Sequence, residues 1–154
     1  MARLKAFARV RRRGVEARVV HGDARELSWR ETFDAIVTSP PYPGLIDYHE
    51  QHRYAYELLG LVDLRSRELG AAARGVSRAA LEAYSAGIAA VLSRARDALR
   101  PRAPVVIVVN DRRGLYPGIL ERAGLVLETT ARRHVNRRTG RRAGEFFEDV
   151  IVAR

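Results

Sequence analysis

The chain has 154 residues and a formal net charge of +10, from 28 basic residues against 18 acidic ones. Its length fits one domain, and 47% hydrophobic residues are enough to build a core, which argues against a disordered arginine-rich tail. No apolar run approaches the roughly 20 residues of a membrane span, and no signal-peptide pattern follows Met1, so we expect a cytoplasmic protein with no membrane partner. The absence of cysteine excludes disulfides, thiolate metal sites and a cysteine nucleophile.

Helical and strand-like periodicities alternate along the chain, which predicts an α/β domain with a mostly parallel sheet. In chain order, the pattern predicts a basic helix over residues 3–13, strands over 15–21 and 33–38, a helix over 54–64, a mobile loop over 66–77, a helix over 78–99, a strand over 105–109, a helix over 115–123, and strands over 125–135 and 146–153. The last two strands would form an antiparallel hairpin with an arginine-rich turn.

The positive charge is almost entirely arginine, because Lys5 is the single lysine. A GC-rich genome also favours arginine, but this net charge still favours a polyanionic partner such as nucleic acid. The candidate phosphate contacts cluster around the last predicted hairpin: Arg132, Arg133, Arg137, Arg138, Arg141 and Arg142. A solvated arginine-rich surface is the alternative interpretation.

The sharpest feature is T-S-P-P-Y, residues 38–42, at the carboxyl end of the strand predicted over residues 33–38. Ligands of open α/β sheets bind at that edge. The two prolines restrict the backbone, so the Ser39 hydroxyl and the Pro40 carbonyl can be held in fixed directions beside the Tyr42 ring. This arrangement suits a planar amino-heterocycle. A rigid strand-ending turn with a surface tyrosine is the alternative.

Two neighbouring acceptors are what the methylation of an exocyclic base amine requires, since the nitrogen lone pair is delocalised into the ring. If the Ser39 oxygen and the Pro40 carbonyl accept the two N–H groups, the nitrogen becomes more pyramidal and its lone pair can attack a methyl sulfonium. Pro41 would fix the backbone and Tyr42 would stack on the base. Such a base must be flipped out of a duplex or already single-stranded.

Residues 33–42 resemble motif IV of the amino-directed DNA methyltransferases, which use S-adenosylmethionine to methylate cytosine N4 or adenine N6. The serine form is typical of the cytosine-N4 branch, whereas adenine enzymes more often have Asp or Asn at the position of Ser39. Residues 43–48 and the ending E-F-F-E-D-V-I-V are similar to the same branch. Methylation at cytosine C5 needs a cysteine nucleophile, so that class is excluded.

The resemblance implies one Rossmann-like class I methyltransferase domain over residues 1–154, with a partial sheet of about five strands, mostly parallel, an antiparallel C-terminal hairpin and helices on both faces. The family's strand order is 3-2-1-4-5-7-6, and its glycine-rich turn after the first strand has no counterpart before residue 15. Strands one and two are therefore expected to be missing. A second chain or dimer mate supplies them, the sequence is a piece of a longer protein, or the sheet closes differently.

Other site residues follow from the same resemblance. Residues 19–23 are similar to the family's third strand, whose final acidic residue lies near the cofactor adenine, so Asp23 is a candidate for holding the adenine amine. A strand-ending turn is the alternative. Thr38 is a second candidate for cofactor binding. Asp47 and Tyr48 are candidates for lining the base pocket.

No metal site is expected, because the histidines have no ligand spacing: His49, His52 and His134. The resemblance as a whole implies a site-specific DNA methyltransferase of a restriction-modification system that acts on cytosine N4. An RNA or adenine-N6 methyltransferase is one alternative. The other is a non-catalytic nucleic-acid-binding remnant, or half of a split methyltransferase.

Overall fold

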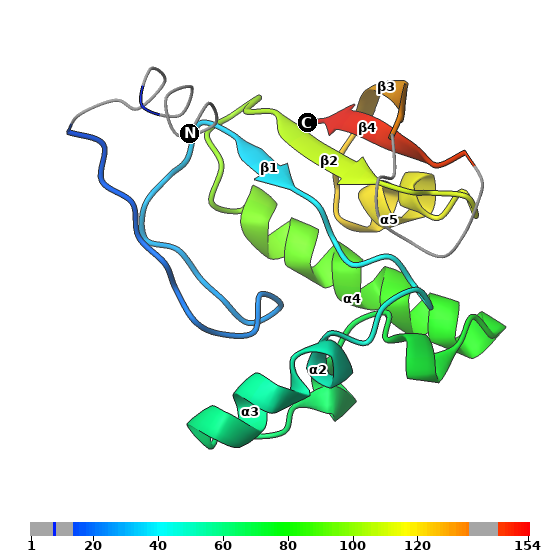
Figure 1. Ribbon diagram of the computed structural model, residues 1–154. Coiled ribbons are helices and arrows are strands. Elements are labelled where there is room, and N and C mark those ends of the chain that lie inside the picture. The colour runs from blue at the N-terminus through cyan, green and yellow to red at the C-terminus, as the bar shows by residue number, and fades with distance from the viewer. Residues whose placement is uncertain (1–7, 9–13, 136–144) are drawn as a thin grey trace.

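The computed structural model describes residue 8, residues 14–135 and residues 145–154 (Figure 1). Within them the elements are β1 (Ile36–Thr38), α2 (Tyr48–Gln51), α3 (Arg53–Leu59), the short 3-10 turns η1 (Arg65–Arg67) and η2 (Ala72–Arg74), α4 (Arg78–Arg96), β2 (Val105–Val109), α5 (Tyr116–Arg122), β3 (Leu127–His134) and β4 (Phe147–Ala153). The basic helix predicted over residues 3–13 lies almost wholly outside the described residues.

The four described strands form one mixed sheet in the order β1-β2-β4-β3. β1 runs parallel to β2, with Val37 opposite Val106, whereas β2 and β3 are both antiparallel to β4. Numbered by the expected family order, these are the fourth, fifth, seventh and sixth strands. The arrangement is therefore compatible with a partial methyltransferase sheet that ends in the predicted antiparallel hairpin.

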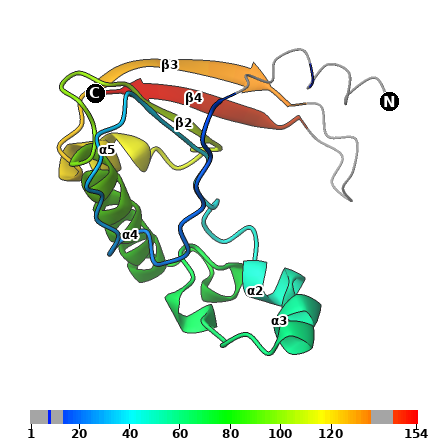
Figure 2. The same cartoon turned by 90° about the vertical axis from the view of Figure 1, so that its left-hand side faces the viewer.

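Helices α4 and α5 lie on the same side of the sheet, as Figure 2 shows, and the core lies between them and the strands. Alternate residues of β2 face this core, and Val105, Ile107 and Val109 are completely buried there. Helix α4 begins where the Ser77 hydroxyl accepts a hydrogen bond from the Ala80 amide, 3.2 Å away. The longest helix and the most β-branched strand of the chain thus form the centre of the domain.

Three expectations about the architecture are wrong: the number of strands, their mostly parallel orientation and the strand over residues 15–21. The described sheet has four strands and only one parallel pair, and its two packed helices, α4 and α5, cover one face. Residues 15–21 are not a strand: they have no ladder partner in the described chain, and Val19 is 96% exposed. A strand needs a hydrogen-bonded neighbour, so local β propensity alone did not form one.

Residues 66–77, predicted as a mobile loop, contain the turns η1 and η2, and their mobility stays a prediction. They are bonded to the segment after β1: the Gly44 amide donates to the Gly70 carbonyl (2.9 Å), and the Ala72 amide donates to the Ile46 carbonyl (3.2 Å). Glycine supplies a turn with positive φ here, as at Gly70 (72°).

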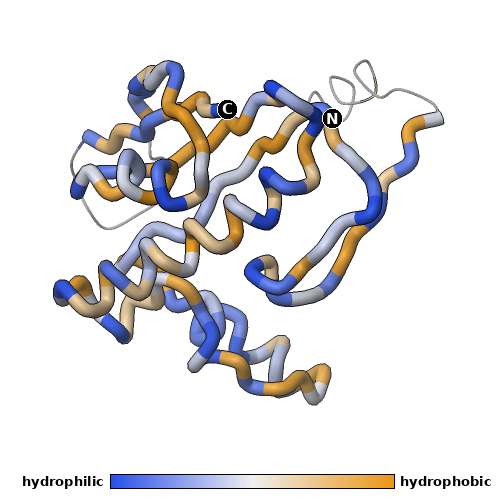
Figure 3. The backbone as a smooth tube through the Cα atoms, turned by 180° about the vertical axis from the view of Figure 1, so that it is seen from behind, coloured by the Kyte–Doolittle hydropathy of each residue, from blue (hydrophilic) through white to orange (hydrophobic). Residues whose placement is uncertain are grey.

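Besides residues 15–21, exposed apolar side chains include those of two further described regions. One is the outer end of α3 with the following turn, coloured as hydrophobic in Figure 3, where Leu58 is 82% exposed. The other is the sheet face turned away from α4 and α5, where Val37 is 77% exposed. In the part of the chain that the structure describes, no helix is long and apolar enough to cross a membrane.

The two faces of the sheet predict unequal losses of stability when a β-branched side chain is truncated to alanine. We expect Ile107→Ala to lower the free energy of unfolding by about 2–5 kcal/mol, because it leaves a cavity in the core. Val37→Ala, on the open face of the neighbouring strand, should change it by about 0.5 kcal/mol or less. Urea unfolding followed by circular dichroism measures both, and equal effects would contradict this assignment of the faces.

Candidate active site

The segment S-P-P-Y, residues 39–42 and hereafter the SPPY segment, leaves the carboxyl end of β1 and runs toward α2 (Figure 1). Its first side chain bonds to the neighbouring strand: Ser39 Oγ donates to the Val108 carbonyl of β2, 2.9 Å away. A hydroxyl has one hydrogen and two lone pairs. Because the hydrogen points to Val108, the Ser39 oxygen is left with lone pairs that can accept hydrogen bonds.

The Pro41 carbonyl is bonded to one member of a pair of buried tyrosines, one from α4 and one from α5, that are bonded to each other. Tyr84 of α4 donates its hydroxyl hydrogen to this carbonyl (2.8 Å), and the Tyr116 hydroxyl of α5 lies 3.0 Å from the Tyr84 hydroxyl. Since the Tyr84 hydrogen is used on Pro41, Tyr116 donates to Tyr84. No local sequence pattern around Tyr84 predicts this contact, because Pro41 lies 43 positions away in the chain.

Tyr42 is held by the C-terminal hairpin. Its hydroxyl donates to Glu148 Oε1 of β4 at 2.8 Å, and its ring lies 6.3 Å from the Phe146 ring, centre to centre, with a tilt of 35°. Partial burial and the hydrogen bond to the Glu148 carboxylate raise the pKa of Tyr42 to about 12. The phenol therefore stays protonated and donates at neutral pH.

Pro40 is the residue of the SPPY segment whose backbone carbonyl has no hydrogen-bond donor among the described residues. Ser39, Pro41 and Tyr42 bond to β2, α4 and β4 respectively, whereas the Pro40 carbonyl accepts no hydrogen bond from any described residue. Two neighbouring acceptors, the Ser39 oxygen and the Pro40 carbonyl, thus remain on a backbone fixed at three points. This is the arrangement that can receive the two N–H groups of an amine.

The predicted cofactor residues occupy different surroundings. Thr38 is the last residue of β1 and pairs with Ile107. The carboxylate of Asp23 contacts two guanidinium groups, those of Arg25 and Arg67, the latter at 2.8 Å, and hydrogen bonds from Arg25 hold its pKa far below the usual range. In this conformation Asp23 joins residues 23–26 to η1, and a role in cofactor binding remains a prediction.

Asp47 and Tyr48 connect the segment after the motif to the turns η1 and η2. Asp47 Oδ1 accepts from the Ala73 amide (3.0 Å), and the Tyr48 amide donates to Glu68 Oε1 (2.7 Å). The Tyr48 ring is exposed, whereas the Asp47 carboxylate is used in the fold. Their contact with a base remains a prediction.

The predicted arginine patch is only partly described. Arg132 and Arg133 of β3 form ion pairs with Asp149 and Glu148 of β4. The other candidates for phosphate contacts lie outside the described residues: Arg137, Arg138, Arg141 and Arg142.

His49 is held within the fold, since its Nε2 accepts from the Leu64 amide at 3.2 Å. Among the described residues no three acidic or histidine side chains are grouped as metal ligands would be.

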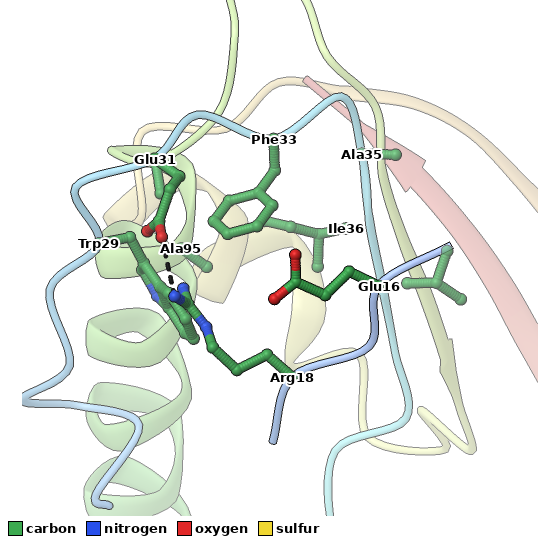
Figure 4. A pocket seen from close by; sticks show the side chains of 10 residues that line it. Glu16, Arg18, Trp29, Glu31, Phe33, Ala35, Ile36 and Ala95 are labelled. Carbon is green, nitrogen blue, oxygen red and sulfur yellow. Dashed lines mark ion pairs between the residues drawn. The ribbon is translucent and has the colours of Figure 1, made fainter. Parts of the chain in front are cut away.

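A hollow of about 550 Å³ lies beside β1, between this strand, the end of α4 and residues 16–33 (Figure 4). The Trp29 and Phe33 rings meet edge to face at 5.4 Å, and Arg18 forms an ion pair with Glu31 at 2.9 Å. No local sequence pattern predicts this hollow, because segments that are far apart in the chain form it.

Comparison with known proteins finds similarity to a methyltransferase. The chain is 36% identical, over 166 aligned positions that cover 98% of its length, to the type II methyltransferase M.MjaII of Methanocaldococcus jannaschii. The alignment covers 31% of that protein, so the chain spans about a third of the length of this relative. No family model matches the chain.

The buried tyrosine pair predicts that stability falls at alkaline pH. Burial raises the pKa of Tyr84 to about 12 and that of Tyr116 further, against 10.0 when exposed. Above pH 10 the folded state therefore keeps the two phenol protons that the unfolded chain releases. The contribution of each tyrosine is complete below pH 10 and is lost, at about 1.4 kcal/mol per pH unit, as the pH rises through its folded pKa.

Urea midpoints measured between pH 8 and pH 12 test this prediction. The decline above pH 10 should be shallower for Tyr84→Phe, which is also less stable at neutral pH because Pro41 and Tyr116 lose a partner. Equal slopes for the variant and the unsubstituted protein would contradict it.

Proposed function

We propose that this chain holds the target base of an S-adenosylmethionine-dependent DNA methyltransferase that acts on the exocyclic amine N4 of cytosine. The observation that carries the proposal is the SPPY segment, fixed at three points with the Ser39 oxygen and the Pro40 carbonyl left as acceptors. Its similarity to a type II methyltransferase over nearly the whole chain supports the reaction class.

Each residue of the segment has a distinct part in this function. Ser39 and Pro40 accept the two N–H bonds of the amine, which turns the nitrogen lone pair out of the base plane. Pro41 fixes the chain direction through its bond to Tyr84. Tyr42 contacts the face of a base that has left the duplex. The amine proton leaves to solvent after methylation.

S-adenosylmethionine supplies the methyl group when it is bound, and Asp23 and Thr38 are the described residues predicted to contact it. The carboxylate of Asp23 is occupied by Arg25 and Arg67. We therefore propose that further polypeptide, in the same chain or a partner, extends the sheet along the outer edge of β1 beside the hollow of Figure 4. The relative, three times longer than the aligned segment, has room for such a part.

The first test places these 154 residues in a complete enzyme. In a chimera where they replace the aligned segment of M.MjaII, we expect Ser39→Ala to reduce methyl transfer to duplex DNA about a hundredfold or more, because one amine acceptor is lost. Ser28→Ala, at an exposed serine outside the SPPY segment, is the matched control and should leave the rate unchanged.

Mass analysis of the product nucleosides tests the assignment of the amine. N4-methylcytosine in DNA is the expected product. N6-methyladenine as the product would overturn the choice of cytosine. Methylated nucleosides that form only when RNA replaces DNA as the substrate would overturn the choice of DNA. Equal rates for Ser39→Ala and Ser28→Ala would overturn the role of the SPPY segment.

The second test is calorimetric titration of the 154-residue chain with S-adenosylmethionine. We expect no heat of binding for the chain alone and micromolar binding for the chimera, since the cofactor site needs the added part of the sheet. Micromolar binding by the 154 residues would show that they complete the site themselves, contrary to the proposed extension of β1.

A further inference from the structure

The side chain of Glu148 lies between the SPPY segment and the outermost strand of the sheet. Its Oε1 accepts the Tyr42 hydroxyl at 2.8 Å, and its Oε2 accepts from Arg133 Nε at 3.0 Å and Arg133 Nη2 at 2.6 Å. One carboxylate oxygen therefore faces the motif and the other faces β3. Charge-assisted bonds of this kind are strong and directional.

The strand register explains why this carboxylate keeps its orientation. Arg133 of β3 lies directly opposite Glu148 of β4, so the arginine reaches it from the neighbouring strand on the same face. The Glu148 side chain is 13% exposed and that of Arg133 is 59% exposed. The acceptor is thus partly shielded from water while the guanidinium covers it from the solvent side.

Apolar packing and the hydroxyl hydrogen bond hold the Tyr42 side chain. Its backbone follows two prolines, its ring lies near Phe146 and packs against the buried cluster, and its hydroxyl is bound by Glu148. Apolar contacts are not directional, whereas a hydrogen bond is. The hydroxyl bond is therefore the directional contact that fixes where the outer end of the ring lies.

We propose that Glu148 is a positioning residue of this site: it holds the Tyr42 ring by its hydroxyl in the orientation that contacts the base, and Arg133 fixes the Glu148 carboxylate. The part about the base rests on the proposed function. Glu148 acts through Tyr42. The competing explanation is that Glu148 only joins β4 to β3 through its ion pair with Arg133.

The neighbouring residue Asp149 supplies a matched control for that explanation. It forms the same kind of ion pair between the same two strands, with Arg132 Nε 2.9 Å from Asp149 Oδ1, and its side chain is 12% exposed. Asp149→Asn therefore removes a cross-strand ion pair of comparable burial while leaving the Tyr42 contact in place.

The experiment is an NMR titration of the Tyr42 phenol carbon in the 154-residue protein labelled with ¹³C-tyrosine. The Tyr42 pKa should fall from about 12 in Glu148→Gln, because the negative charge beside the phenol is lost, and stay unchanged in Asp149→Asn. Arg133→Gln, at an exposed position, is a second variant with the opposite sign: its lost positive charge should raise the Tyr42 pKa, with Arg132→Gln as control. Equal shifts within either pair would overturn the contact.

The methyl-transfer assay in the chimera tests the positioning role separately. Glu148→Gln should lower kcat about tenfold with KM for DNA nearly unchanged, Asp149→Asn should keep the unsubstituted rate, and Tyr42→Phe combined with Glu148→Gln should be no slower than Tyr42→Phe alone. An unchanged kcat in Glu148→Gln would overturn the role. If the unsubstituted chimera transfers no methyl group, the proposed function fails, and the titration alone decides the contact.

Discussion

The hydrogen bond from the buried Tyr84 hydroxyl to the Pro41 carbonyl is the constraint on which the candidate site depends. Pro40 and Pro41 have no N–H group, so this stretch cannot join the sheet through a ladder of backbone donors. It can be fixed only through its carbonyls and through the side chains beside the prolines. Three of these groups are hydrogen-bonded: the Ser39 hydroxyl to β2, the Pro41 carbonyl to α4 and the Tyr42 hydroxyl to β4.

These contacts make the position of the site a property of the core. Tyr84 and Tyr116 belong to the buried cluster that joins α4 and α5 to β2, and Tyr42 packs against its edge. Protein interiors are close-packed and transmit small displacements. The orientation of the SPPY segment therefore depends on the packing of the whole cluster, including residues with no access to a substrate.

The sequence predicts the parts of this domain that are locally encoded. β2 is where its β-branched run indicates, α4 follows its apolar spacing, and the SPPY motif follows β1. The contacts that fix the motif were not predictable, since the partners of Ser39, Pro41 and Tyr42 lie 69, 43 and 106 positions away in the chain. The strand predicted over residues 15–21 is absent because it also depends on a distant partner. Its valines give β propensity, but a strand forms only beside another strand.

In the proposed function, the three contacts of the SPPY segment also separate the base site from the methyl-donor site in space. All of them run from β1 toward β2, α4 and β4, and in the described chain none uses the opposite edge of β1, where the hollow lined by Trp29, Phe33 and Val37 lies. The acceptors for a target amine can thus be positioned by the four described strands and two helices alone. A donor site built along the free edge of β1 would join a base site that already has its shape, because both would share the carboxyl end of one parallel strand.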